Sequence, residues 1–118
     1  MTALNYLEGK YQMHIITNGF DKAQELKMKN AGIGKFFDVV VTSETANTRK
    51  PSPEIFELSL SLAKANIANS IMIGDNPKTD IQGAQEFGMK TIFYNPAGNK
   101  KSLADYTIES HMELIKLF

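Results

Sequence analysis

The sequence contains no cysteine, no tryptophan and no long apolar run. Without cysteine it has no disulfide, no thiolate metal site and no thiol nucleophile. No stretch approaches the roughly 20 apolar residues of a membrane span, and residues 1–10 lack the pattern of a signal peptide. Neither sign of charge dominates, because 13 Lys and Arg balance 13 Asp and Glu. We therefore expect a cytoplasmic protein that binds neither membranes nor nucleic acid.

One α/β domain over residues 1–118 is the simplest organisation for a chain of this length. Short apolar runs at 13–16, 39–41, 71–73 and 91–94 predict strands, and amphipathic stretches between them predict helices. Strands that alternate with helices favour a parallel, three-layer Rossmann-like sheet. The tail from residue 106 is expected to add a short strand and a last helix.

Local signals place several helix ends. Asp21 is expected to cap a helix over residues 22–30, with Ala23 and Leu26 on its inner face and Gly32 at its end.

A second helix is expected to begin at Ser52 and Pro53, a capping hydroxyl followed by proline at the first helical position. The polar residues 43–50 before it predict a loop.

Residues 71–80 form the most informative segment. An apolar run ends at Gly74, and two carboxylates, Asp75 and Asp80, follow five residues apart. Paired acids at the end of a buried strand suit Mg²⁺, which takes oxygen ligands and shares them with phosphate. The alternative is a polar turn in which Thr79 or Asp80 caps the next helix.

Two other strand ends carry polar groups. Thr17, Asn18 and Gly19 offer a hydroxyl and turn amides that suit a phosphate oxygen, although an ordinary turn has the same composition. Lys50 precedes a helix start, where a cation opposes the helix dipole unless an anion lies nearby; the alternative is a surface lysine. Together the three ends offer what a phosphoryl group and Mg²⁺ require.

The segments 16–20 (ITNGF), 49–56 (RKPSPEIF) and 73–81 (IGDNPKTDI) resemble motifs II, III and IV of the haloacid dehalogenase (HAD) superfamily. Residues 38–44 (DVVVTSE) resemble the segment before the family lysine. The resemblance covers roughly residues 3–96 and is closest to the pyrimidine 5′-nucleotidase-like branch, whose members carry a helical cap.

The resemblance implies a role for each matching residue. Thr17, helped by the Asn18 amide and Gly19, would bind the transferring phosphoryl oxygens. Lys50 would neutralise charge on the nucleophile and the phosphoryl group. Asp75 would ligate Mg²⁺.

Asp80 would support the metal or orient Lys50, and Asn76 would be a lesser polar contributor. The implied activity is Mg²⁺-dependent hydrolysis of a phosphomonoester through an aspartyl-phosphate. The substrate would be a small phosphorylated metabolite, such as a nucleotide.

The nucleophile of that reaction is missing, because no Asp-x-Asp occurs in the sequence. The five aspartates are Asp21, Asp38, Asp75, Asp80 and Asp105, and none is expected at the nucleophile's position. In the family the Asp-x-Asp strand is central and the cap follows it. We therefore expect this chain to be the carboxy-terminal part of a larger enzyme, inactive alone and weak in Mg²⁺ binding.

Loss of a central strand would leave two unpaired strand edges, which are costly when buried and adhesive when exposed. We expect either direct pairing of the flanking strands, which contain Ile15 and Met72, or completion of the sheet. A second copy in a homodimer or the missing amino-terminal segment would complete it.

Two other classes of protein compete with the enzyme. The first is a non-catalytic binding or interaction module that retains the fold. The second is a phosphoacceptor receiver domain, but there the acid pair precedes the threonine and the lysine, which reverses the order seen here.

Overall fold

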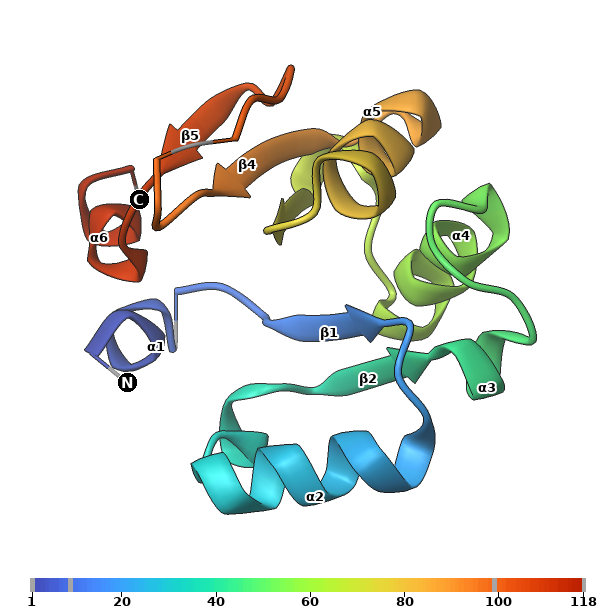
Figure 1. The fold of residues 1–118 in the computed structure, drawn as a ribbon. Helices are drawn as coiled ribbons and strands as arrows, with labels where there is room; N and C mark the ends of the chain where they lie inside the picture. The colour runs from blue at the N-terminus through green and yellow to red at the C-terminus, as the bar shows by residue number, and fades with distance from the viewer. Residues whose placement is uncertain (1, 9, 99, 118) are drawn as a thin grey trace.

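A computed structural model describes residues 2–8, 10–98 and 100–117 (Figure 1). Strands and helices alternate along most of the chain, as the sequence predicts. The strands are β1 (His14–Thr17), β2 (Val39–Thr42), β3 (Ile71–Gly74), β4 (Lys90–Tyr94) and β5 (Tyr106–Ile108). The α-helices are α1 (Thr2–Leu7), α2 (Asp21–Ala31), α3 (Ser43–Ala46), α4 (Pro53–Ala63), α5 (Gly83–Phe87) and α6 (Leu114–Leu117).

The strands form two parallel sheets. β1 pairs with β2, with Ile16 opposite Val41. β3, β4 and β5 pair in that order, with Ile73 opposite Ile92 and Phe93 opposite Thr107. This is the expected Rossmann-like arrangement divided in two, because no described strand lies between β1 and β3.

The expectation that the strands of Ile15 and Met72 pair directly is wrong. Among the described strands, β1 bonds only to β2, and β3 bonds on one side only, to β4. Ile71 and Ile73, whose side chains share one face of β3, remain 41% and 37% exposed. Completion of the sheet by a second chain or another segment stays a prediction.

Two apolar clusters hold the fold together. The first joins both sheets through α4 and α5: Ile55 and Phe56 pack with Val41 of β2 and Met72 of β3. The second lies at the far end, where α1 and α6 lie side by side (Figure 1). It contains Leu7, Ile92, Ile108 and Leu114. The first cluster fixes the relative position of the two sheets and hence of the polar loops at their ends.

Helix α2 corrects one sequence expectation. It lies on the side of β1 and β2 away from α4 and α5 (Figure 1), and none of its residues is buried. Ala23 is exposed and Leu26 is 60% exposed, so they do not form an inner face. The reason is that a two-stranded sheet offers a helix little surface, and Met28 and Val40 both line a hollow of about 560 Å³.

The helices end close to where the sequence predicts, but the predicted capping residues do not make the capping hydrogen bonds. Gly32 ends α2 with φ 67°, but Asp21 is its first residue and Phe20 is the cap, so Asp21 does not cap it. Ser52 precedes α4 as expected, yet its side chain makes no capping bond. The expected loop over residues 43–50 contains the short helix α3.

The described residues include no helix long and apolar enough to cross a membrane.

Candidate functional site

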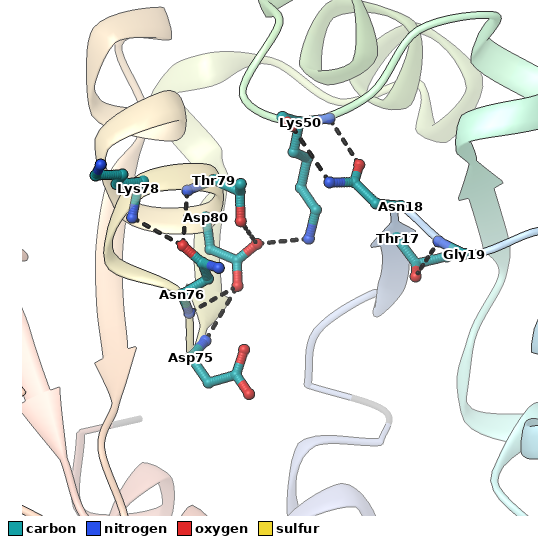
Figure 2. Close-up of polar contacts among 9 residues, drawn as sticks. All are labelled: Thr17, Asn18, Gly19, Lys50, Asp75, Asn76, Lys78, Thr79 and Asp80. Atoms are coloured by element: carbon teal, nitrogen blue, oxygen red, sulfur yellow. Dashed lines mark hydrogen bonds and ion pairs between the residues drawn. The ribbon is translucent and has the colours of Figure 1, made fainter.

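The polar residues singled out at three strand ends lie together in the structure (Figure 2). Asn18 follows β1 and bonds to the backbone of Lys50, which precedes α4. The Lys50 ammonium reaches Asp80, beyond the end of β3. The loops of both sheets are therefore joined by a continuous set of contacts at one edge of the molecule.

Asp80 is the most enclosed member of the site, with 4% of its surface exposed. Its Oδ1 lies 2.5 Å from Lys50 Nζ, and its Oδ2 accepts the backbone N–H groups of Asp75 and Asn76 at 3.1 Å each. The carboxylate thus orients both the lysine and the loop that carries Asp75. Both oxygens of the carboxylate are therefore engaged, and the two expected roles of Asp80, support of the metal or orientation of Lys50, stay predictions.

The alternative in which Thr79 or Asp80 caps the following helix is wrong. Asn76 caps it: its Oδ1 accepts the N–H groups of Lys78 and Thr79 at 2.9 and 3.0 Å. The helix begins as a single π-helical turn over Pro77–Gln82 and continues as α5. That turn places the Asp80 side chain back under the end of β3.

Two glycines allow the loops to approach one another so closely. A β-carbon on Gly74 would overlap the Asp80 side chain. A β-carbon on Gly83 would lie 2.7 Å from Cβ of Pro51, the residue after Lys50. Because such contacts are closer than atoms tolerate, glycine is needed at both positions. Sequence reasoning used Gly74 only as a strand end and did not single out Gly83.

Thr17 ends β1 with its hydroxyl available for donation. Its Oγ1 accepts the Gly19 N–H at 3.1 Å, and the hydroxyl hydrogen has no acceptor among the described residues. A hydroxyl oriented in this way by a turn amide suits an incoming anionic oxygen.

Residues at the end of β2 brace the turn that follows Thr17, which the sequence did not reveal. Ser43 Oγ contacts the carbonyl oxygens of Asn18 and Gly19 at 3.1 and 3.3 Å. Glu44 Oε1 accepts the Asp21 N–H at 2.7 Å, and the Thr42 hydroxyl donates to the Asp21 carboxylate. A run of hydroxyl residues directly after a strand was the available signal.

The three remaining aspartates lie away from the position expected for the nucleophile. Asp21 is engaged with Thr42, as above. Asp38 lies before β2, with its N–H bonded to Met13 O at 2.9 Å. Asp105 Oδ2 accepts the N–H of Thr91 at 2.8 Å, at the beginning of β4. None lies between β1 and β3, where the family's nucleophile is expected.

Asp75 provides one free carboxylate. It is exposed and makes no side-chain hydrogen bond or ion pair to a described residue. The described residues contain no group of three or more His, Cys, Asp or Glu side chains that would hold a metal. Since Asp80 is occupied by Lys50 and two amides, Asp75 alone does not complete a Mg²⁺ site.

One carboxyl group near the site has a shifted pKa. The Ser52 hydroxyl donates to Glu54, in the first turn of α4, and lowers its pKa below the ordinary value. The Glu54 backbone amide lowers this pKa further.

Solved structures share the fold of this chain over nearly its whole length. A HAD phosphatase from Thermococcus onnurineus superimposes with a TM-score of 0.93 at 34% identity and covers 99% of this chain. The HAD-hydrolase YfnB of Bacillus subtilis, solved with bound magnesium, gives a TM-score of 0.91 at 26% identity. The fold is that of HAD hydrolases.

The model of the haloacid dehalogenase-like hydrolase family matches residues 1–94, and the chain belongs to this family. The pyrimidine 5′-nucleotidase YjjG of Escherichia coli is 32% identical over 80% of the chain. A glyceraldehyde 3-phosphate phosphatase from Methanothermobacter thermautotrophicus is 38% identical over 72% of it. The chain spans only 43% and 38% of these two relatives and 55% of the Thermococcus structure.

Proposed function

We propose that this chain forms the phosphoryl-binding part of a Mg²⁺-dependent phosphatase. The observation that carries the proposal is the continuous set of contacts from Asn18 through Lys50 and Asp80 to the Asp75 loop. It holds a hydroxyl, an ammonium and a free carboxylate at one edge through contacts between protein groups. Such preorganised charge is the main means by which enzymes stabilise a phosphoryl transition state.

Each residue has one task in this proposal. The Thr17 hydroxyl donates to a phosphoryl oxygen. The Lys50 ammonium has three hydrogens, of which Asp80 takes one, so the others are available to the phosphoryl group and the nucleophile. Asp75 contributes one ligand to Mg²⁺, whose chemistry when bound is neutralisation of phosphoryl charge.

The nucleophile comes from a segment outside the 118 residues. This segment would lie between β1 and β3 and pair with their free edges, which places an Asp-x-Asp at its carboxyl end beside Thr17 and Asp75. It would also complete the metal site. The free edges of two strands that are held in place by one apolar cluster support this arrangement.

The substrate class is a small phosphorylated metabolite. The relatives include phosphatases named for nucleotides and for a sugar phosphate. A nucleotide is our proposed substrate because two of the relatives are named pyrimidine 5′-nucleotidases.

A non-catalytic module is the second candidate. It is favoured by the absence of Asp-x-Asp from the sequence and by the single free carboxylate among the described site residues. It would use the same fold for association alone.

The test compares the purified 118-residue chain with the same chain preceded by the in-frame sequence encoded upstream of Met1. With Mg²⁺ and p-nitrophenyl phosphate, we expect no hydrolysis by the short chain. We expect the longer chain to hydrolyse this substrate, and we expect Lys50→Met to lower its kcat about 100-fold or more. Turnover by the short chain free of contaminating phosphatase, or an upstream sequence without Asp-x-Asp, would overturn the proposal.

A further inference from the structure

Both polar atoms of the Asn18 side chain bond to the backbone of Lys50, 32 residues away. Lys50 N–H donates to Asn18 Oδ1 at 2.7 Å, and Asn18 Nδ2 donates to Lys50 O at 3.2 Å. Both bonds are drawn in Figure 2, where the carboxamide turns toward the Lys50 backbone. Each polar atom of the carboxamide therefore has a protein partner.

We call the two hydrogen bonds between the Asn18 side chain and the Lys50 backbone the Asn18 clamp. The turn that carries this clamp is held by a residue that follows the neighbouring strand. Ser43, directly after β2, contacts the carbonyl oxygens of Asn18 and Gly19. The turn after β1 is therefore held by its backbone on one side, and it holds Lys50 by its side chain on the other. Because the clamp is tied to the end of a strand, it has a defined position from which to place Lys50.

The position of the ammonium depends on where its backbone begins. Lys50 Nζ lies 2.5 Å from Asp80 Oδ1, and its side chain is 11% exposed. A flexible four-carbon side chain reaches such a partner from many backbone positions. The Asn18 clamp restricts these positions, and Asp80 then fixes the far end of the side chain.

We infer that Asn18 is a positioning residue for Lys50, and that its carboxamide does not bind the phosphoryl group. This inference rests on the proposed function for its catalytic meaning, but the clamp itself is a property of the chain alone. It adds a second role to the sequence expectation, which gave Asn18 a phosphate-binding role through its backbone amide; that expectation stays a prediction. The Thr17 hydroxyl remains available there, whereas the Gly19 N–H already donates to Thr17 Oγ1.

The first test needs no activity. In the labelled 118-residue chain, NMR should detect a through-hydrogen-bond coupling between Lys50 N and Asn18 Cγ. In Asn18→Ala, exchange of the Lys50 amide with solvent should accelerate about tenfold, the equivalent of one net hydrogen bond. Asn18→Asp retains the acceptor and should stay within about threefold of the native rate.

The matched control is Asn30→Ala, at an exposed asparagine of α2 that makes no side-chain hydrogen bond to a described residue. It should leave Lys50 exchange unchanged. An absent coupling in the native chain, or unchanged exchange in a folded Asn18→Ala, overturns the inference. If Asn18→Ala does not fold, the native coupling and Asn18→Asp decide.

The second test uses the longer, active protein. A positioning role predicts that Asn18→Ala lowers kcat about tenfold or more and leaves KM within twofold, with partial recovery in Asn18→Asp. A rise in KM with unchanged kcat would instead make the carboxamide a substrate ligand and overturn the inference. If the longer protein has no activity, the proposed function fails while the exchange result still decides the clamp.

Discussion

The Asp80 side chain packs directly against Gly74, in the space that a β-carbon of residue 74 would take. This contact lets the carboxylate reach the backbone N–H groups of Asp75 and Asn76 from beneath the strand end. The strand that carries the Asp75 loop and the acid that orients Lys50 are thereby fixed together.

Substitution of Gly74 should therefore displace Asp80. We expect Gly74→Ala to lower the free energy of unfolding by about 2 kcal/mol, as overpacking does, measured by urea denaturation. Gly34→Ala is the control, because the nearest atom to its β-carbon, Met28 Cε, is 4.0 Å away; it should change stability by less than about 0.5 kcal/mol. Equal effects of the two substitutions would contradict the packing argument.

The two acids of the loop should differ sharply in their effect on stability. Asp80→Asn leaves the largely buried Lys50 ammonium without its partner, which should cost about 3 kcal/mol. Asp75→Asn, at an exposed carboxylate without a described partner, should change the free energy of unfolding by less than about 0.5 kcal/mol. Chemical denaturation of both variants at neutral pH measures this, and similar values for the two would refute the assignment.

Substitution of Gly83 should also lower stability by overpacking, here against Pro51, the residue after Lys50. In Gly83→Ala the new methyl group meets Pro51 at 2.7 Å and Phe56 at 3.2 Å. We expect a loss of 1–3 kcal/mol, of the order of other overpacked sites, together with a shifted Lys50 amide resonance. A destabilised variant with an unmoved Lys50 resonance would show that α5 yields and the lysine loop does not.

Helix α2 should tolerate changes that the main core does not. Leu26→Gln, at a side chain that is 60% exposed, should alter the free energy of unfolding by less than about 0.5 kcal/mol. Ile55→Ala, in the fully buried contact of α4, should cost 2–5 kcal/mol. If Leu26→Gln costs more than about 1.5 kcal/mol, α2 is covered in solution, and sedimentation would then show whether a second copy covers it.

The Glu54 carboxyl should titrate below its ordinary value of 4.5 because Ser52 donates to it. A folded-state pKa below the unfolded one stabilises the fold above the unfolded pKa, and this contribution is lost as pH falls through the folded pKa. Ser52→Ala should raise the Glu54 pKa toward 4.5, followed by carbon NMR of the carboxyl group. Ser61→Ala, on the same helix, should leave it unchanged.

The order of strands and helices followed from the sequence because each element has its own local signal. The runs at 39–41 and 71–73 became β2 and β3, and Gly32 ended α2 as its composition indicates. The same local reasoning failed for the inner face of α2. Periodicity identifies which residues share a side of a helix, but not whether a sheet is there to bury them.

The residue types of the site also followed from the sequence, and their bonding did not. Thr17 ends β1, Asp75 follows β3, and Lys50 lies just before α4, and the sequence signals place all three at such element ends. The use of Asn18 as a clamp, Asn76 as a cap and Asp80 as a double acceptor depends on distances between loops far apart in the chain.

The sequence by itself determined the α/β class, the family motifs and the lack of an Asp-x-Asp, because these are properties of residue order. Only the tertiary structure decided that β1 and β3 do not pair with each other and that the loops at their ends are nevertheless joined. The physical reason is that strand pairing needs a neighbour within hydrogen-bond reach. Side chains as long as lysine reach across a separation that backbones do not.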